Sequence, residues 1–307
     1  MLPVPTRTHE RAGRVVVFVV AVTVLGLLVL SRSDRRRGGE GALSAALEGA
    51  DAGAALLLRG ATSRTVRGRL VMVPCHGVFA GSTLAEAEDE SAWQLDSWMR
   101  THVPSLVGHV RGGLADSGPD DLLMFSGGRT KREARRSEAA GYAAVAEAVW
   151  TGAHAADAHA PPKPAWALEE HARDSFENLL FSVCEYRRIR GRYPESVTVV
   201  GFAFKRKRFV EQHARALRLP RFSYLGLDRG LPASMEEMEL KSVIPLFVRD
   251  PFGCAAPLAE KRALRNPFAE DPAAHYAAAC PELAPALSDC GPGPFPGPFP
   301  WEASGRA

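Results

Sequence analysis

Three loops of this chain combine glycine or basic residues with other polar groups, and each follows an apolar run. The loops are Pro74-Cys75-His76-Gly77, Ser126-Gly127-Gly128 and Ala203-Phe204-Lys205-Arg206. Glycine lets backbone N–H groups approach an anion closely, and the N-terminus of a following helix favours negative charge. The three loops together therefore predict a site for a phosphate- or carboxylate-bearing small molecule.

The predicted site draws its polar groups from these loops and from two helix starts that follow them. The expected ligand-binding residues are Gly77, Ser126, Gly127, Gly128, Asn178, Lys205 and Arg206. His76 and Glu138 are the acid–base candidates, because no other side chain near these loops titrates suitably. A reaction at such a site would be hydrolysis or group transfer rather than redox chemistry.

Each of these features also has a structural interpretation. A glycine pair at a strand end is commonly a turn, and the chain has neither a GxGxxG fingerprint nor a GxxxxGK[S/T] loop. The basic residues after Phe204 can form a solvated helical turn, although positive charge is unfavourable at a helix N-terminus, which favours an anionic partner. Neighbours in an extended segment point to opposite sides, so we expect Cys75 to pack in the core while His76 faces the ligand.

Apolar runs that alternate with helical segments must position these loops. Strands are expected at residues 70–73, 121–125, 197–204 and 222–226, and helices at 93–111, 132–150, 174–191 and 205–217. This alternation needs crossover connections, so the predicted fold class is α/β with a mostly parallel sheet covered on both faces. Ligands bind such sheets beyond the carboxyl ends of the strands, which is where all three loops are expected.

Composition and cysteine spacing exclude some classes of function. The chain is 46% hydrophobic and 24% charged, as globular proteins are, and its net charge of +3 is small for a dedicated nucleic-acid binder. The five cysteines form no CxxC pair or zinc-ligand cluster, so no metal site is expected. Their odd number argues against a complete disulfide framework, and a single Cys254–Cys280 bridge stays open if the domain faces an oxidising compartment.

Residues 15–31 carry the pattern of a transmembrane signal anchor. No charged residue lies between Arg14 and Arg32, and a helix over this stretch would span roughly 25 Å. That length suits a thin endomembrane of the ER or Golgi type, which is the expected location of a single-pass protein. A cleaved signal sequence, a cleaved transit peptide with organellar localisation, and a buried soluble helix stay open as alternatives. Arginines flank both ends, so the orientation also stays open.

The order of the motifs resembles the domain of unknown function 218 family, which includes the bacterial YdcF, SanA and ElyC proteins. The resemblance is carried by Ser126-Gly127-Gly128, Ser137-Glu138-Ala139 and Asp174-Ser175-Phe176-Glu177-Asn178, followed by a strand and a basic helix. Residues 247–254 and 261–268 look like the eukaryotic branch found in fungi and algae. The resemblance covers roughly residues 69–283. The first loop and the Phe204-Lys205-Arg206 segment differ from the bacterial pattern, which tends to have a His in the third loop.

This resemblance implies a Rossmann-like three-layer sandwich whose loops gather at one sheet edge. It also implies S-adenosylmethionine or a nucleotide as a ligand, but it fixes no reaction. The expected organisation is a tail over residues 1–14, the anchor over 15–31, a stalk over 32–68, the α/β domain over 69–283 and a Pro/Gly-rich disordered tail over 284–307. One helix is expected between Pro232 and that tail.

Two functions follow as hypotheses. The first is a membrane-anchored enzyme or binding protein for an anionic small molecule, either nucleotide-like or a phosphate-containing lipid or glycan precursor. The second is a non-catalytic membrane-tethered scaffold that uses the same domain for binding and the Pro-rich tail as a ligand for a protein partner.

Overall fold

The computed structural model describes residues 68–154, 157, 161–228, 231–291 and 293–303. The chain divides into two units, Met1–Arg64 and Thr65–Ala307, and every described residue lies in the second. The expected anchor over residues 15–31 lies outside the described residues, as do the tail before it and nearly all of the stalk. Within the described ranges, every helix is too short or too polar to span a bilayer.

Five parallel strands form the main sheet. They are β1 (Arg69–Pro74), β4 (Leu122–Ser126), β5 (Trp166–Glu169), β6 (Ser196–Gly201) and β7 (Phe222–Gly226), in the order β5-β4-β1-β6-β7. The chain runs outward from β1 through β4 to β5 and then crosses to the other side of β1 for β6 and β7. The strand order therefore reverses between β1 and β6. The predicted α/β class with a parallel sheet is confirmed.

A smaller antiparallel pair and several helices complete the structure. The pair joins β2 (Val78–Phe79) to β3 (Trp93–Gln94). The longer helices are α5 (Val103–Asp116), α6 (Glu138–His154), α7 (Ser175–Arg190), α11 (Leu258–Leu264) and α12 (Pro272–Ala279). The short ones are α4 (Leu84–Ala87), η1 (Glu90–Ala92), η2 (Ser97–His102), η3 (Ala203–Lys205), η4 (Arg208–His213), α8 (Ala214–Ala216), α9 (Ser234–Met238), η5 (Glu239–Val243), α10 (Ile244–Arg249), η6 (Pro281–Leu283), α13 (Ala284–Leu287) and α14 (Pro300–Ala303).

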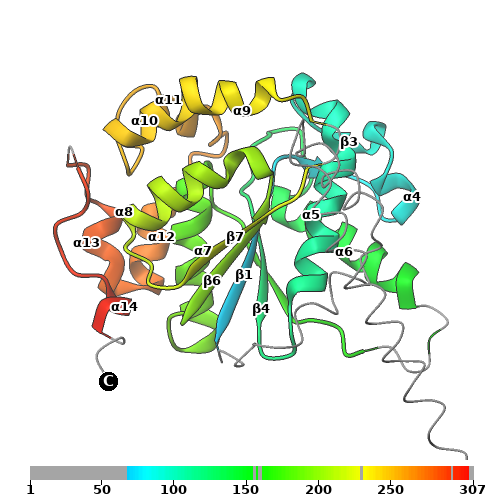
Figure 1. Ribbon diagram of the computed structural model, residues 1–307, viewed down its shortest axis with the longest axis horizontal. Helices are drawn as coiled ribbons and strands as arrows, with labels where there is room; N and C mark the ends of the chain where they lie inside the picture. The colour runs from blue at the N-terminus through cyan, green and yellow to red at the C-terminus, as the bar shows by residue number, and fades with distance from the viewer. Residues whose placement is uncertain (1–67, 155–156, 158–160, 229–230, 292, 304–307) are drawn as a thin grey trace, which may run out of the picture. The chain divides into compact units, whose positions relative to one another are not determined.

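Helices cover both faces of the sheet (Figure 1). α5 and α6 lie on one face, and α7, α8 and α12 lie on the other. The central strand β1 shows why both faces must be covered, because its side chains alternate between two hydrophobic cores. Leu70 and Met72 belong to one core, and Val71 and Val73 belong to the other. Both cores and all five strands lie within residues 65–307, so this unit can fold on its own.

The segment from α9 to α11 covers the end of the sheet at which the parallel strands finish (Figure 1). It is bound to the rest of the fold by ion pairs and a disulfide, described below. The sequence predicts one helix between Pro232 and the tail, whereas the structure forms a succession of short helices there. Proline residues within the first turns of α10, α12 and α13 explain this division, because proline starts a helix well but interrupts one that is already formed.

Two segments near the site differ from their predicted form. The helix expected over residues 93–111 is instead β3, then η2, then α5, whose first turn contains Pro104. Proline at the first turn of a helix marks its start. The strand β5 is missed by sequence reasoning, because it is short and directly follows the Pro-rich residues 161–164.

The Pro/Gly-rich tail over residues 284–307 was predicted to be disordered, but its described part is packed against the domain. Phe299 is 2% exposed and Trp301 is 4% exposed, and their rings stack 4.8 Å apart. The Trp301 indole Nε1 donates a hydrogen bond to the Leu217 carbonyl over 2.8 Å. A high proline and glycine content favours disorder, but the aromatic residues between the prolines are buried here and hold the segment against the domain.

Two disulfides hold the C-terminal part of the chain. They join Cys184 to Cys280 and Cys254 to Cys290, with Cα–Cα distances of 6.0 Å and 5.5 Å. The bridge considered from the sequence, Cys254–Cys280, is wrong, because separation along the chain does not reveal which Cα atoms lie within bonding range. Cys75 is a buried free cysteine that packs in one hydrophobic core, as expected, and it also lines the cavity described below.

Two glycines of α6 provide a test of how this helix packs. A Cβ atom at Gly141 would lie 2.7 Å from the backbone N of Phe79, whereas one at the exposed Gly152 would meet only the Leu84 Cδ2 atom, at 3.5 Å. Gly141→Ala should therefore lower the free energy of unfolding by about 1–3 kcal/mol through overpacking. Gly152→Ala should raise it by about 0.5–1 kcal/mol, because alanine favours the helix. Urea unfolding of residues 65–307 measures both, and stabilisation by both variants would contradict the close packing of α6 on β2.

Candidate functional site

A cavity of about 520 Å³ opens at the edge where the parallel strands end. His76, which follows β1, and Lys205, at the end of η3 after β6, both line it. These are the two strands between which the strand order reverses, and open α/β sheets bind ligands at this point. Glu138 at the start of α6 and Asn178 in the first turn of α7 line the same cavity. The structure thus brings together four of the residues predicted from the sequence.

Lys205 and His76 are in direct contact. The Lys205 Nζ atom lies 3.2 Å from the His76 Nε2 atom, so a neutral imidazole can accept a hydrogen bond from the ammonium group. Lys205 is only 8% exposed, and its Nζ atom also lies 4.9 Å from the centre of the Phe202 ring, on which the His76 ring stacks. Burial and the neighbouring cation Arg208 hold the pKa of Lys205 well below its usual value. Burial and Lys205 do the same to the pKa of His76.

Two further cations from α11 line the cavity. Lys261 lies on α11, and Arg265 is the C-cap residue four positions later, so the two lie on the same side of the chain at the helix end. Burial and the adjacent Arg265 lower the pKa of Lys261 to about 8. The Arg265 Nη1 atom donates to the Arg173 carbonyl over 3.0 Å. Among the described residues, no carboxylate lies within ion-pair distance of Lys205, Lys261 or Arg265. Within the described residues these three side chains therefore lack a carboxylate in direct contact, although Glu138, Asp174 and Glu239 line the same cavity and attract them at longer range.

Other cations at the cavity are paired with carboxylates and act as supports. Arg208 binds Glu239 through two hydrogen bonds of 2.6 Å, which ties η5 to η4. The same guanidinium donates through Nη1 to the Ser175 Oγ atom over 3.0 Å. Arg208 is paired with Glu239, so it orients the segment that carries Lys205, and it still adds positive potential beside that side chain.

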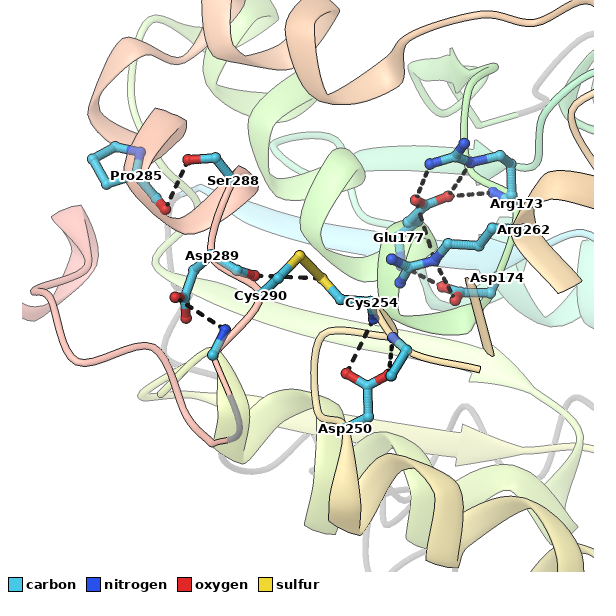
Figure 2. Close-up of a disulfide and its surroundings, with 12 residues drawn as sticks. Arg173, Asp174, Glu177, Asp250, Cys254, Arg262, Pro285, Ser288, Asp289 and Cys290 are labelled. Atoms are coloured by element: carbon cyan, nitrogen blue, oxygen red, sulfur yellow. Dashed lines mark hydrogen bonds and ion pairs between the residues drawn. A yellow bond between two sulfur atoms is a disulfide. The ribbon is translucent and has the colours of Figure 1, made fainter. Parts of the chain in front are cut away.

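An ion-pair network fixes α11 against the start of α7 (Figure 2). The Arg262 Nε atom lies 2.7 Å from the Asp174 Oδ2 atom and 3.3 Å from the Glu177 Oε1 atom. Glu177 is also bound by Arg173, and Asp174 caps α7 by accepting from the N–H groups of Phe176 and Glu177. Arg262 lies between Lys261 and Arg265 in sequence, so this network sets the position of both unpaired cations.

The disulfide Cys254–Cys290 holds the segment that leads into α11 (Figure 2). Asp250 accepts hydrogen bonds from the N–H groups of Cys254 and Ala255 over 3.0 Å and 2.7 Å. The bridge and this turn together restrict the approach of α11 to the cavity.

Ser126 lies beneath the cavity and does not line it. Its side chain is fully buried, and its Oγ atom donates to the Glu169 carboxylate. The Asn178 Nδ2 atom donates to the Ser126 carbonyl and to its Oγ atom, both over 2.9 Å. These contacts join the ends of β4 and β5 to α7.

Glu169 at the end of β5 is the acceptor at the centre of this buried network, and sequence reasoning missed it. It accepts from Ser126, from Tyr276 Oη over 3.0 Å, and from the N–H groups of His171 and Ala172. Burial raises the pKa of Glu169 to about 7 despite these four donors. The sequence signal for Glu169 is an acidic residue at the end of the short apolar run Trp166-Ala167-Leu168. A run this short does not identify a strand.

The two glycines of the second loop serve packing. The Gly127 N–H group donates to the Glu169 carbonyl over 2.9 Å, and the Gly128 N–H group donates to the Ala172 carbonyl over 2.8 Å. A Cβ atom on Gly127 would lie 2.8 Å from the Glu138 Cβ atom, so only glycine lets the start of α6 approach this closely. Both N–H groups are engaged within the protein, which leaves anion binding at this cavity to side chains.

Gly77 and Arg206 also lie away from the cavity lining. Gly77 packs against Leu95, whose Cδ2 atom would lie 2.2 Å from a Cβ at this position. Arg206 is exposed, and its guanidinium lies 5.4 Å from the centre of the Tyr224 ring. Of the two neighbouring cations in the third loop, the structure directs only Lys205 into the cavity.

Acid–base chemistry at the cavity would fall to His76 and Glu138. Burial raises the pKa of Glu138, and the Thr130 hydroxyl donates to its Oε1 atom. A carboxyl group with a raised pKa can donate a proton near neutral pH, and a neutral imidazole can accept one. Across the ranges that the structure describes, no cluster of His, Cys, Asp and Glu has the arrangement of a metal site.

Comparison with known proteins yields one partial similarity. The uncharacterized protein YOR238W of Saccharomyces cerevisiae is 33% identical over 114 residues, which cover 33% of this chain and 37% of the yeast protein. No family model matches the chain, and no solved structure matches it. The chain thus matches little more than a third of the length of the yeast protein, whose description gives no activity.

Proposed function

We propose that this protein uses the cavity at the sheet edge to bind a phosphate-bearing or nucleotide-like anion. The observation that supports this most is the group formed by Lys205, Lys261 and Arg265, which has no carboxylate partner in the described part of the chain. Placing positive charges together in a partly desolvated site is unfavourable unless an anion compensates them. A phosphate group offers several negatively charged oxygen atoms, each of which can accept a charge-assisted hydrogen bond from one of these side chains.

The proposed reaction, if the bound anion is also transformed, is hydrolysis or group transfer. Glu138 would donate a proton to the leaving group. His76, whose pKa burial and the neighbouring cations lower in the free protein, would accept one from the attacking group once the bound anion offsets those cations. Both side chains line the cavity beside the unpaired cations, which would stabilise charge that develops on a transferred phosphoryl group.

We further propose that the chain is a eukaryotic member of the domain of unknown function 218 family with a Rossmann-like three-layer sandwich. The parallel sheet with helices on both faces is consistent with this fold, and the motif order around residues 126–128 and 174–178 supports the family. Of the two ligands that the resemblance implies, the charge of the cavity favours a nucleotide. S-adenosylmethionine carries a positive sulfonium group, which the cations of this cavity would repel.

A membrane anchor over residues 15–31 and an endomembrane location complete the proposal. The two disulfides support a domain that faces the oxidising lumen, because disulfides form and persist in such compartments. The domain would then lie on the lumenal side, with the short N-terminal tail in the cytosol.

Fractionation of cells that express the full-length chain tests this placement. The protein should stay in the membrane pellet after carbonate extraction, because a spanning helix is not released by high pH. Alkylation of the denatured, unreduced protein should label Cys75 alone, since the other four cysteines are bridged. Release into the supernatant would refute the anchor, and labelling of Cys254 and Cys290 would refute the lumenal placement.

The alternative function is a non-catalytic scaffold, and calorimetry with inorganic pyrophosphate separates the two. Residues 65–307 should bind pyrophosphate, and Lys205→Met should weaken binding at least tenfold, about 1.4 kcal/mol, through loss of a buried cation. Lys207→Met is the matched control, because Lys207 is two residues away, exposed and absent from the cavity lining. An absence of heat with the wild-type domain, or equal loss in both variants, would favour the scaffold.

A further inference from the structure

We infer that the ligand of this cavity is amphipathic, with a phosphate head bound at the buried Lys205 and a hydrocarbon chain bound at the mouth. This inference rests on the proposed function and names the class of its ligand. The observation behind it is a set of large apolar side chains that line the cavity yet remain open to solvent: Trp98, Met238 and Leu264.

These three side chains are unusually exposed for their type. Trp98 is 50% exposed, Met238 is 46% exposed and Leu264 is 83% exposed. They come from η2, α9 and α11, which are far apart in sequence, and the fold brings them to one cavity. A single exposed apolar residue needs no explanation, but several around one binding cavity mark a surface that covers an apolar partner.

Lys205 is the most deeply buried of the three cations, whereas Lys261 is exposed and Arg265 is half-buried. The anion-binding Lys205 is 8% exposed, and the buried residues Met99 and Phe204 continue the apolar lining inward from the mouth. A ligand would therefore meet Lys205 at its inner end and the exposed side chains of Trp98, Met238 and Leu264 at its outer end, with Lys261 beside them. A sugar phosphate would place hydroxyl groups against Leu264 and Met238, which cannot form hydrogen bonds with them. A phosphate ester of an alkyl or isoprenoid chain matches both ends.

Calorimetric titration of residues 65–307 with methyl phosphate, hexyl phosphate and AMP tests the inference below the micelle concentration of each compound. Each methylene that is fully buried strengthens binding roughly fourfold. Because the mouth covers only one side of the chain, we expect hexyl phosphate to bind at least tenfold more tightly than methyl phosphate. AMP should gain less than hexyl phosphate, since among the described lining residues Trp98 is the one aromatic side chain that is exposed at the mouth for a base to stack on.

Two variants locate the apolar contact. Trp98→Ala and Leu264→Ser should bring the hexyl-to-methyl affinity ratio close to one and leave the affinity for methyl phosphate unchanged, because neither side chain touches the head group. Val248→Ser is the control, since Val248 is 59% exposed but does not line the cavity. Circular dichroism of each variant checks that the fold is retained, which is expected for exposed positions.

The possible outcomes separate this inference from the proposed function. If methyl phosphate, hexyl phosphate and pyrophosphate all fail to bind, the proposed function itself is refuted. If methyl and hexyl phosphate bind equally, only the amphipathic ligand is refuted. A larger gain for AMP that is lost in Trp98→Ala would replace the hydrocarbon chain with a nucleotide base. An unchanged hexyl-to-methyl ratio in both rim variants would place the chain elsewhere and overturn the inference.

Discussion

Positive charge held near the end of a parallel sheet, with no carboxylate in direct contact among the residues that the structure describes, is the constraint on which this site depends. Lys205 is buried against an imidazole and two aromatic rings rather than against a carboxylate. A buried ammonium normally requires a close negative charge, and nearby cations increase the cost of keeping it protonated. Lys261 and Arg265 add to that cost. The protein carries an unfavourable arrangement that an anionic ligand would relieve, and such arrangements concentrate at functional sites.

The remainder of the fold holds these charges in place. The strand order reverses between β1 and β6, so the segments carrying His76 and Lys205 diverge from a common edge. Arg262 fixes α11 by binding Asp174 and Glu177 at the start of α7, and the Cys254–Cys290 bridge restrains the chain before it. Beneath the cavity, the Glu169 carboxylate at the end of β5 accepts four hydrogen bonds. Their donors lie at the end of β4, in the loop after β5 and on α12. The ion pairs and the buried hydrogen bonds thus position the cations that have no carboxylate in direct contact.

The sequence predicts the sheet well and the site only in part. β1, β4 and β6 are buried on both faces, so their apolar runs were recognisable. The carboxyl ends of parallel strands share an edge of the sheet, and for this reason the sequence predicts that His76 and Lys205 lie close together. The sequence does not predict the roles of Lys261, Arg265 and Glu169, because these roles depend on tertiary packing between segments that are far apart along the chain. Gly127 and Gly128 fit an anion loop by composition, but their N–H groups have internal partners that a sequence does not reveal.

Linkage between anion binding and protonation tests the central claim most directly. Burial and neighbouring cations lower the pKa of Lys205, His76 and Lys261 in the free protein, and a bound phosphate would raise all three. Calorimetry at pH 8 with sulfate, a dianion that does not titrate in this range, in buffers of different ionisation enthalpy, should therefore report net proton uptake on binding, with affinity that rises as the pH falls. Proton release, or an affinity that does not change with pH, would contradict an anion bound by these cations.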